Sequence, residues 1–211
     1  MSSSLLEVSK KPERYHHGDL KNALLDAARD LAGEGSVDGF TLREVARRAG
    51  VSPAAPYHHF ADKNDLVRQL AIRAFDTMRQ TLQTAADSTT DSAQQLEVMG
   101  VAYLRFAFTH AAEFRFMFKR ELCAPPGQPD PLEVAGRAAQ AVLHSAVVAA
   151  QANQTIRAGD PQLTVLTIWS AIHGLSGILL ETPSGKNATL ENAEEMARNV
   201  IANLLSGVRQ R

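Results

Sequence analysis

The chain contains 211 residues, with 22 Lys and Arg against 23 Asp and Glu, and its net charge is −1. This balance excludes nucleic-acid binding through a general excess of positive charge. The one cysteine, Cys123, excludes an intrachain disulfide and is typical of a reducing compartment. Because there is no run of about 18 apolar residues and no N-terminal secretory signal, we expect a cytoplasmic protein without a membrane span.

The chain opens with a polar arm that is followed by a first helix. Residues 1–13 are polar and lack periodicity, which predicts a disordered arm, and its lysines make it basic. From about Asp19 to Glu34, apolar residues recur every three or four positions, which predicts a helix. Glycines on either side of residues 36–38 then indicate a loop.

A pattern of two short helices joined by a tight turn comes next. Thr41 is placed to cap the first helix, and Glu44 three residues later completes a capping box. Gly50 tolerates the left-handed backbone conformation that such a turn needs. Ser52 is placed to cap the second helix, with Pro53 in its first turn. This arrangement predicts a helix-turn-helix motif, whose second helix enters the major groove of duplex DNA.

The remainder of the chain keeps the helical period. Asp62 is placed to cap a long helix that connects the motif to the rest, and a polar break follows at residues 87–92. The helices expected after the motif cover residues 62–84, 92–110, 111–119, 131–156, 160–181 and 189 onward. No segment alternates with the period of a strand, so we predict an all-α fold of about nine helices. It divides into a three-helix DNA-binding domain (residues 14–62) and a helical C-terminal domain (residues 63–211).

The motif and its surroundings resemble the DNA-binding domain of the tetracycline-repressor (TetR) family of bacterial regulators. The matching residues are Gly39, Phe40, Thr41, Val45, Ala46, Ala49, Gly50, Val51, Ser52, Tyr57, His59, Phe60, Lys63 and Leu66. Residues 15–20 upstream and Trp169, His173 and Gly174 downstream resemble one branch of that family, which is named for a Trp…His-Gly signature. In the family, the C-terminal domain binds ligands and forms the dimer.

The second motif helix departs from the family pattern. Many members carry Gly where this chain has Ala54 or Ala55, and Pro56 falls inside the helix. Because proline fixes its own backbone and lacks an amide donor, we expect a stiffer or shorter recognition helix within an intact motif.

Eight side chains are candidates for contact with DNA. They are Thr41, Arg43, Ser52, Pro53, Ala54, Tyr57, His58 and Lys63. The resemblance implies that Tyr57 and Lys63 contact phosphates. Ser52 has two open roles, helix cap and phosphate donor, and Arg43 either reaches DNA or is a solvated surface residue. The apolar candidates offer only contact to thymine methyl groups, so we expect much of the specificity to come from DNA shape.

The resemblance also implies a cavity in the C-terminal domain, where a small-molecule effector moves the long connecting helix. The candidate lining is Tyr103, Phe106, Phe114, Met117, Trp169 and His173. The alternative is that these residues are ordinary core, since aromatic residues at helical spacing mostly pack. His110, His144 and His173 lie on three predicted helices, but no His pair at i, i+4 supports a metal site. With no catalytic set or cofactor motif, we expect no metal, no cofactor and no enzymatic activity.

The helix at residues 160–181 is apolar over a wider arc than one buried face needs. Either it is buried centrally in its own domain, or it shares its surface with a partner. The resemblance implies a homodimer through the last two helices, with recognition helices roughly 34 Å apart or somewhat more on a palindromic operator. We therefore expect a transcriptional repressor that a small-molecule ligand releases. The alternative is a helical small-molecule or metal sensor that does not bind DNA.

Overall fold

The computed structural model describes residues 17–35, 39–125 and 127–208, and this part of the chain is all-α without strands. The α-helices are α1 (His17–Glu34), α2 (Leu42–Arg48), α3 (Lys63–Asp87), α4 (Ser92–Thr109), α5 (Ala111–Met117), α6 (Pro131–Ala152), α7 (Pro161–Glu181) and α8 (Leu190–Val208). Short 3₁₀ turns are η2 (Ala55–His58), η3 (Arg120–Leu122) and η4 (Pro183–Gly185). The predicted fold class is confirmed, and the predicted number of helices is close to the eight observed. The basic arm, residues 1–13, lies outside the described residues.

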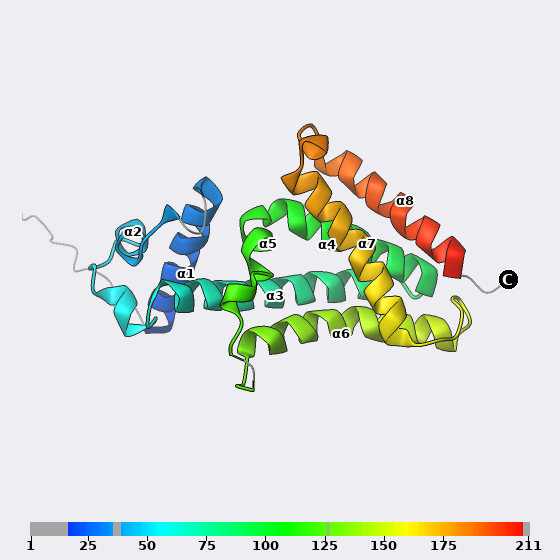
Figure 1. Cartoon of the computed structure of the whole chain (residues 1–211), viewed down its shortest axis with the longest axis horizontal. Helices are drawn as coiled ribbons and strands as arrows, with labels where there is room; N and C mark the ends of the chain where they lie inside the picture. Colours follow the sequence, from blue (N-terminus) through cyan, green and yellow to red (C-terminus); the bar gives the residue numbers. More distant parts are fainter. Residues whose placement is uncertain (1–16, 36–38, 126, 209–211) are drawn as a thin grey trace, which may run out of the picture.

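The helices form an elongated molecule in which α3 joins its two ends (Figure 1). At one end, α1 packs against α2 and against α3, while at the other end α4 and α6 pack along α3, with α7 and α8 laid over α4. One continuous cluster of buried apolar side chains runs from Leu24 of α1 through Leu70 of α3 to Ile201 of α8. The two ends of the molecule therefore share a core that α3 carries between them.

The sequence explains why α3 is long and where it begins. The side chain of Asp62 accepts a hydrogen bond from the amide of Asp65 at 2.8 Å, which is the predicted cap. Along one side of the helix, its apolar residues recur at helical spacing and are buried. They are Leu66, Leu70, Ala74, Met78 and Leu82. Twenty-five residues make a helix about 37 Å long, which reaches from the motif deep into the C-terminal half.

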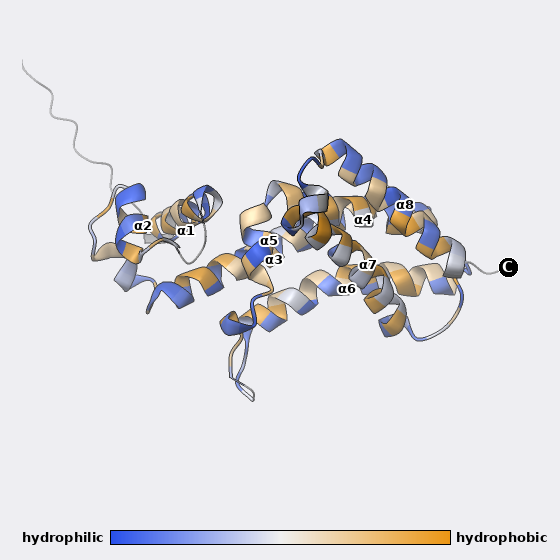
Figure 2. Cartoon of the chain, turned by 45° about the horizontal axis from the view of Figure 1, so that its top comes forward, coloured by the Kyte–Doolittle hydropathy of each residue, from blue (hydrophilic) through white to orange (hydrophobic). Residues whose placement is uncertain are grey.

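Among the described helices, α7 is the most apolar (Figure 2). Asp160 caps it through the amide of Gln162, and Pro161 occupies the first turn, as predicted. By length and composition alone α7 could cross a membrane, although the sequence has no unbroken apolar run, and only 28% of its most apolar stretch is buried. One such helix is weak evidence for a membrane span, but it qualifies the expectation that the chain contains no candidate span.

Helices α4 and α8 pack closely at Gly100. A Cβ atom added there would lie 2.7 Å from Cγ1 of Ile201, a fully buried side chain. We predict that Gly100→Ala lowers the free energy of unfolding by about 1 kcal/mol, because the clash outweighs the gain in helix propensity. The matched control is Gly33→Ala in α1, where the added methyl meets open space, and it should be neutral or stabilising. Urea unfolding of both variants checks this, and a gain in both would contradict close packing at Gly100.

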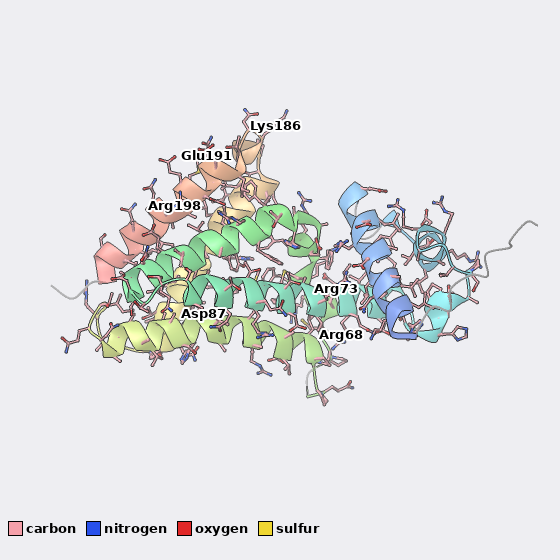
Figure 3. All side chains as sticks on the ribbon, turned by 180° about the vertical axis from the view of Figure 1, so that it is seen from behind. Arg68, Arg73, Asp87, Lys186, Glu191 and Arg198 are labelled. Atoms are coloured by element: carbon pink, nitrogen blue, oxygen red, sulfur yellow. The ribbon has the colours of Figure 1, made fainter. Side chains whose placement is uncertain are left out.

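Asp130 ties α3 to the start of α6. Its Oδ1 accepts hydrogen bonds from Arg68 of α3 at 2.6 Å and from the amide of Leu132 at 2.9 Å, and its Oδ2 accepts one from the amide of Ala124 at 2.8 Å. Burial opposes ionisation of this carboxyl, but the two amides and the Arg68 guanidinium outweigh it and hold its pKa below the usual value. Figure 3 labels Arg68 on α3.

A lowered pKa means that the Asp130 carboxylate contributes stability above its unfolded pKa of about 3.9 and loses it as the pH falls through the folded value. We predict that Arg68→Met lowers the free energy of unfolding at pH 7 by about 1–2 kcal/mol, since the guanidinium is partly exposed. The difference from the parent should shrink below about pH 4. Arg79→Met, which breaks a long surface bridge to Asp76, is the control and should change little at any pH. A gap for Arg68→Met that persists unchanged at pH 3 would contradict the ionic role.

Candidate DNA-binding surface and internal cavity

The first motif helix, α2, starts with the predicted capping box. The amide of Thr41 donates to Oε2 of Glu44 at 2.8 Å, and the amide of Glu44 donates to Oγ1 of Thr41 at 3.3 Å. The Thr41 hydroxyl also donates to Oε2 of Glu44 at 2.9 Å, and these bonds hold the pKa of Glu44 below its usual value. The one hydroxyl proton of Thr41 is thus engaged, so this side chain donates to a phosphate only after exchanging that bond.

The turn of the motif depends on Gly50. Its φ of +71° lies in the left-handed region, where a side chain would be strained. The amide of Gly50 donates to the carbonyl of Arg47 at 3.2 Å, and the amide of Val51 donates to the carbonyl of Ala46 at 3.0 Å. These two bonds form a Schellman motif, which ends α2 and turns the chain toward the second motif segment.

The second motif segment is a 3₁₀ turn, η2, and not the α-helix capped by Ser52 that we predicted. Its cap position is Ala54, without a side-chain hydrogen bond, and its first turn contains Pro56. Because Pro56 has no amide proton to give to the carbonyl of Ser52, that carbonyl accepts instead from the amide of Ala55 at 3.0 Å, which is the 3₁₀ pattern. The expectation of a shortened recognition segment is correct, and the capping role of Ser52 is wrong.

The motif exposes most of the candidate DNA-binding side chains. The exposed ones are Thr41, Arg43, Ser52, Pro53, Ala54, Tyr57 and His58. Tyr57 is 57% exposed although it is a large aromatic residue. Lys63, the first residue of α3, is half-buried, and its Nζ lies 4.8 Å from the centre of the Phe40 ring. The guanidinium of Arg48 donates to both carboxylate oxygens of Glu34, at 2.6 and 2.8 Å, so this arginine braces α1 against α2.

A cavity of about 340 Å³ lies in the C-terminal half, between α3, α4, α6 and α7. Its walls are apolar, and α3 contributes Phe75, Met78 and Leu82. The charged residues of its lining, Glu133 and Arg137 among them, are mostly exposed and lie at its mouth. Sequence reasoning missed the three residues of α3, because a buried stripe at helical spacing reads the same whether it faces a neighbour or a cavity.

Of the six predicted lining residues, Tyr103, Met117 and Trp169 line this cavity, and the other three do not. Phe106 is buried and stacks on His110, with ring centres 4.5 Å apart. The other two lie behind the wall. Phe114 packs edge-on against Tyr103, and His173 contacts the rings of Phe114, Phe118 and Trp169.

Tyr103, Trp169 and His173 form a hydrogen-bonded cluster at the cavity wall. The Tyr103 hydroxyl lies 2.8 Å from Nδ1 of His173, and Nε1 of Trp169 donates to the same hydroxyl at 3.3 Å. Burial lowers the pKa of His173, against the opposing effect of the Glu181 carboxylate, so the imidazole is neutral at pH 7. Burial also raises the pKa of the Tyr103 hydroxyl, so this group keeps its proton. The cluster is therefore uncharged.

Two of the three histidines considered for a metal site have other partners. His110 is bonded to Thr109 at 2.9 Å and His173 to Tyr103. Within the described ranges, no group of three or more His, Cys, Asp or Glu side chains is placed to share an ion.

Comparison with known proteins agrees with this architecture. Residues 24–70 match the family of bacterial regulatory proteins named tetR, and residues 96–204, more than half of the chain, match the tetracyclin repressor-like C-terminal domain. An HTH-type transcriptional regulator of Haemophilus influenzae is 30% identical over 47% of this chain and 49% of its own length. The HTH-type transcriptional activator FasR of Mycolicibacterium smegmatis is 25% identical over 62% and 59%. The chain thus aligns with about half to three-fifths of these two relatives.

Solved structures share the fold over almost the whole chain. A protein of unknown function from Rhodococcus sp. RHA1 superposes with a TM-score of 0.82 at 28% identity, over 94% of this chain and 100% of that one. The transcriptional regulator FadR from Bacillus subtilis, solved with stearoyl-CoA, superposes with a TM-score of 0.72 at 15% identity, over 89% and 99%. The motif, the helical C-terminal half and the match over both parts lead to one conclusion: the chain belongs to the TetR family of bacterial regulatory proteins.

Proposed function

We propose that this protein is a cytoplasmic transcriptional repressor, which binds a palindromic operator as a homodimer and is released by a small molecule. The observation that carries the proposal is the position of α3. Its first residue, Lys63, lies beside the DNA-binding motif, and Phe75, Met78 and Leu82 further along it line the cavity. A ligand that displaces this helix displaces the motif with it, provided that the ligand binds one position of α3 better than the other.

The motif has the chemistry to bind duplex DNA. Arg43, Tyr57 and His58 are exposed side chains that offer hydrogen-bond donors to phosphates or base edges. Lys63 lies beside the Phe40 ring at the start of α3, where the positive end of the helix dipole favours an anion. Because η2 is one 3₁₀ turn with few polar side chains, we propose that DNA shape contributes much of the specificity.

The exposed face of α7 supports dimerisation. Leu163, Leu166 and Ile178 are 63%, 49% and 51% exposed, and all lie on that face at helical spacing. Gly174 lies between them, and a Cβ atom there would meet nothing within 4 Å, which leaves room for another helix to approach. On the neighbouring helix α8, Glu191 and Arg198 point outward at the edge (Figure 3). An apolar centre with a charged rim is the composition of a protein–protein interface.

The cavity supports release by a small molecule. Its volume falls at the lower end of the roughly 300–1,000 Å³ that ligand pockets occupy, and its lining is apolar with few polar groups. The FadR structure holds stearoyl-CoA, which is one instance of this fold solved with a ligand.

Binding of the purified protein to its own upstream intergenic DNA tests the regulator. We predict retardation of a specific fragment, with log affinity falling linearly with log salt because phosphate contacts release counterions. The double variant Tyr57→Ala, Lys63→Ala should abolish retardation of the specific fragment. For the non-specific binding that remains, the slope of log affinity against log salt should be smaller by about 0.9 for each phosphate that is no longer neutralised. Arg79→Ala, about four turns further along α3, is the matched control and should bind like the parent. Unchanged binding by the double variant would contradict the assigned DNA face and favour a sensor that does not act through this motif.

A charge placed on the α7 face tests the dimer. We predict that Leu166→Glu yields a monomer in sedimentation velocity and loses operator retardation, because a carboxylate cannot be buried unpaired in an apolar interface. Val148→Glu is the control, since Val148 is 41% exposed on α6, away from the proposed interface. Both variants should keep the parent's helical content. A dimeric Leu166→Glu protein would place the interface elsewhere.

A further inference from the structure

The buried part of the cavity lining carries no charge. The charged members of the lining, Lys119, Glu133 and Arg137, are half-buried or exposed, and the last two are bonded to each other at 3.0 Å. The buried members are aliphatic, aromatic and methionine side chains, with the Tyr103 hydroxyl as their one polar side-chain group. Because a charge enclosed among these side chains would have no counter-charge, the enclosed part of a ligand is uncharged and mainly apolar.

Methionines are concentrated in this lining. Of the five methionines of the chain, Met78, Met99 and Met117 line the cavity, and each is only 2% exposed. They belong to three different helices, α3, α4 and α5. A methionine side chain is unbranched with three rotatable bonds, and its thioether contacts alkyl groups and aromatic rings alike. These three side chains can therefore change rotamer around ligands of different shape without displacing the helices that carry them.

The aromatic members of the lining are held in place by their neighbours. The Tyr103 hydroxyl is hydrogen-bonded to His173 at 2.8 Å and to Trp169 at 3.3 Å. The ring of Phe75 packs edge-on against Phe118, with ring centres 5.4 Å apart. A thioether is at most a weak hydrogen-bond acceptor, so no comparable bond orients a methionine. The lining thus combines rings of fixed orientation with side chains that adapt.

We propose that the cavity accepts uncharged apolar molecules of differing shape, and that Met78, Met99 and Met117 provide this breadth by changing rotamer around each of them. In a pocket of rigid side chains, a misfit of one methylene group changes affinity by about tenfold or more, whereas methionine-rich surfaces repack around different partners. The proposal deepens the proposed function, since it takes the cavity to be the effector site. The three methionines then determine how selective the response to effectors is.

Three alcohols with the same number of carbon atoms test the breadth, because they differ mainly in shape. 1-Octanol is a chain, cyclooctanol is a compact ring, and 2-phenylethanol is a flat aromatic ring with a short arm. Each is titrated into the full-length protein without DNA while the fluorescence of Trp169, the only tryptophan of the chain and a residue of the cavity wall, is followed. Each affinity is corrected for the free energy of transferring the alcohol from water to alkane, so that hydrophobicity alone creates no difference. We predict that the three corrected affinities agree within about fivefold.

A variant with stiffer side chains tests the methionines. The triple variant Met78→Leu, Met99→Leu, Met117→Leu keeps the lining apolar and nearly unchanged in volume, but each leucine is branched and has better-defined rotamers. We predict that its three corrected affinities spread over more than about tenfold, because a probe of the wrong shape is no longer accommodated. Met196→Leu is the matched control, since Met196 is 45% exposed on α8 and does not line the cavity, and its affinities should equal those of the parent. Circular dichroism establishes that each variant is folded. If the triple variant is unfolded, the parent and the three single variants, each of which should widen the spread, still decide the proposal.

A parent protein that binds none of the alcohols, binds only one shape, or shows a larger spread than predicted would overturn the proposal. A spread in the stiffened variants no wider than in the parent would overturn the role of the methionines. The regulatory function fails separately. If the breadth holds but saturating amounts of all three alcohols leave operator retardation unchanged, the adaptability of the cavity stands and release by a ligand at this site is refuted.

Discussion

The structure depends on α3 being continuous. The Asp62 cap starts this helix in the DNA-binding module, and its buried stripe then passes into the core of the C-terminal half. Two ion pairs fix it on either side: Arg73 to Asp26 of α1 at 2.9 Å, and Arg68 to Asp130 before α6 at 2.6 Å. In the proposed function, a helix held in this way moves as one body, so that a displacement at the cavity also moves the motif.

The DNA-binding motif is built to be rigid, and its composition limits how it reads DNA. The capping box of Thr41 and Glu44 and the turn at Gly50 fix α2, whereas Pro56 reduces the second segment to a 3₁₀ turn. Few polar side chains remain to contact base edges. In the proposed function, affinity therefore comes from phosphate contacts by residues such as Tyr57 and Lys63, and specificity comes from DNA shape and from the spacing of two motifs in a dimer.

Much of the fold could be predicted because local chemistry dictates it. Caps at Thr41, Asp62 and Asp160 and helical periodicity place the helices within a few residues of their observed bounds. The sequence did not reveal that Ser52 caps no helix. Pro56 has no amide proton to donate to the carbonyl of Ser52, so the amide of Ala55 donates to it and a 3₁₀ turn forms in place of the predicted α-helix. Of the six residues predicted to line the cavity, Tyr103, Met117 and Trp169 lie in its wall. Periodicity shows that a residue is inward-facing, but only the packing of four helices decides whether it meets a neighbour or empty space.

The measurement that tests the central claim most directly is the distance between the two motifs of a dimer with and without a cavity ligand. A spin label on Arg47→Cys, in a Cys123→Ser background, reports that distance by pulsed electron resonance. We predict that this distance shifts when 1-octanol fills the cavity, with filling judged by Trp169 fluorescence. The variant Leu82→Trp places a larger side chain in the cavity from α3, and it should shift the distance without any ligand. An unchanged distance with the cavity demonstrably filled would contradict the coupling through α3.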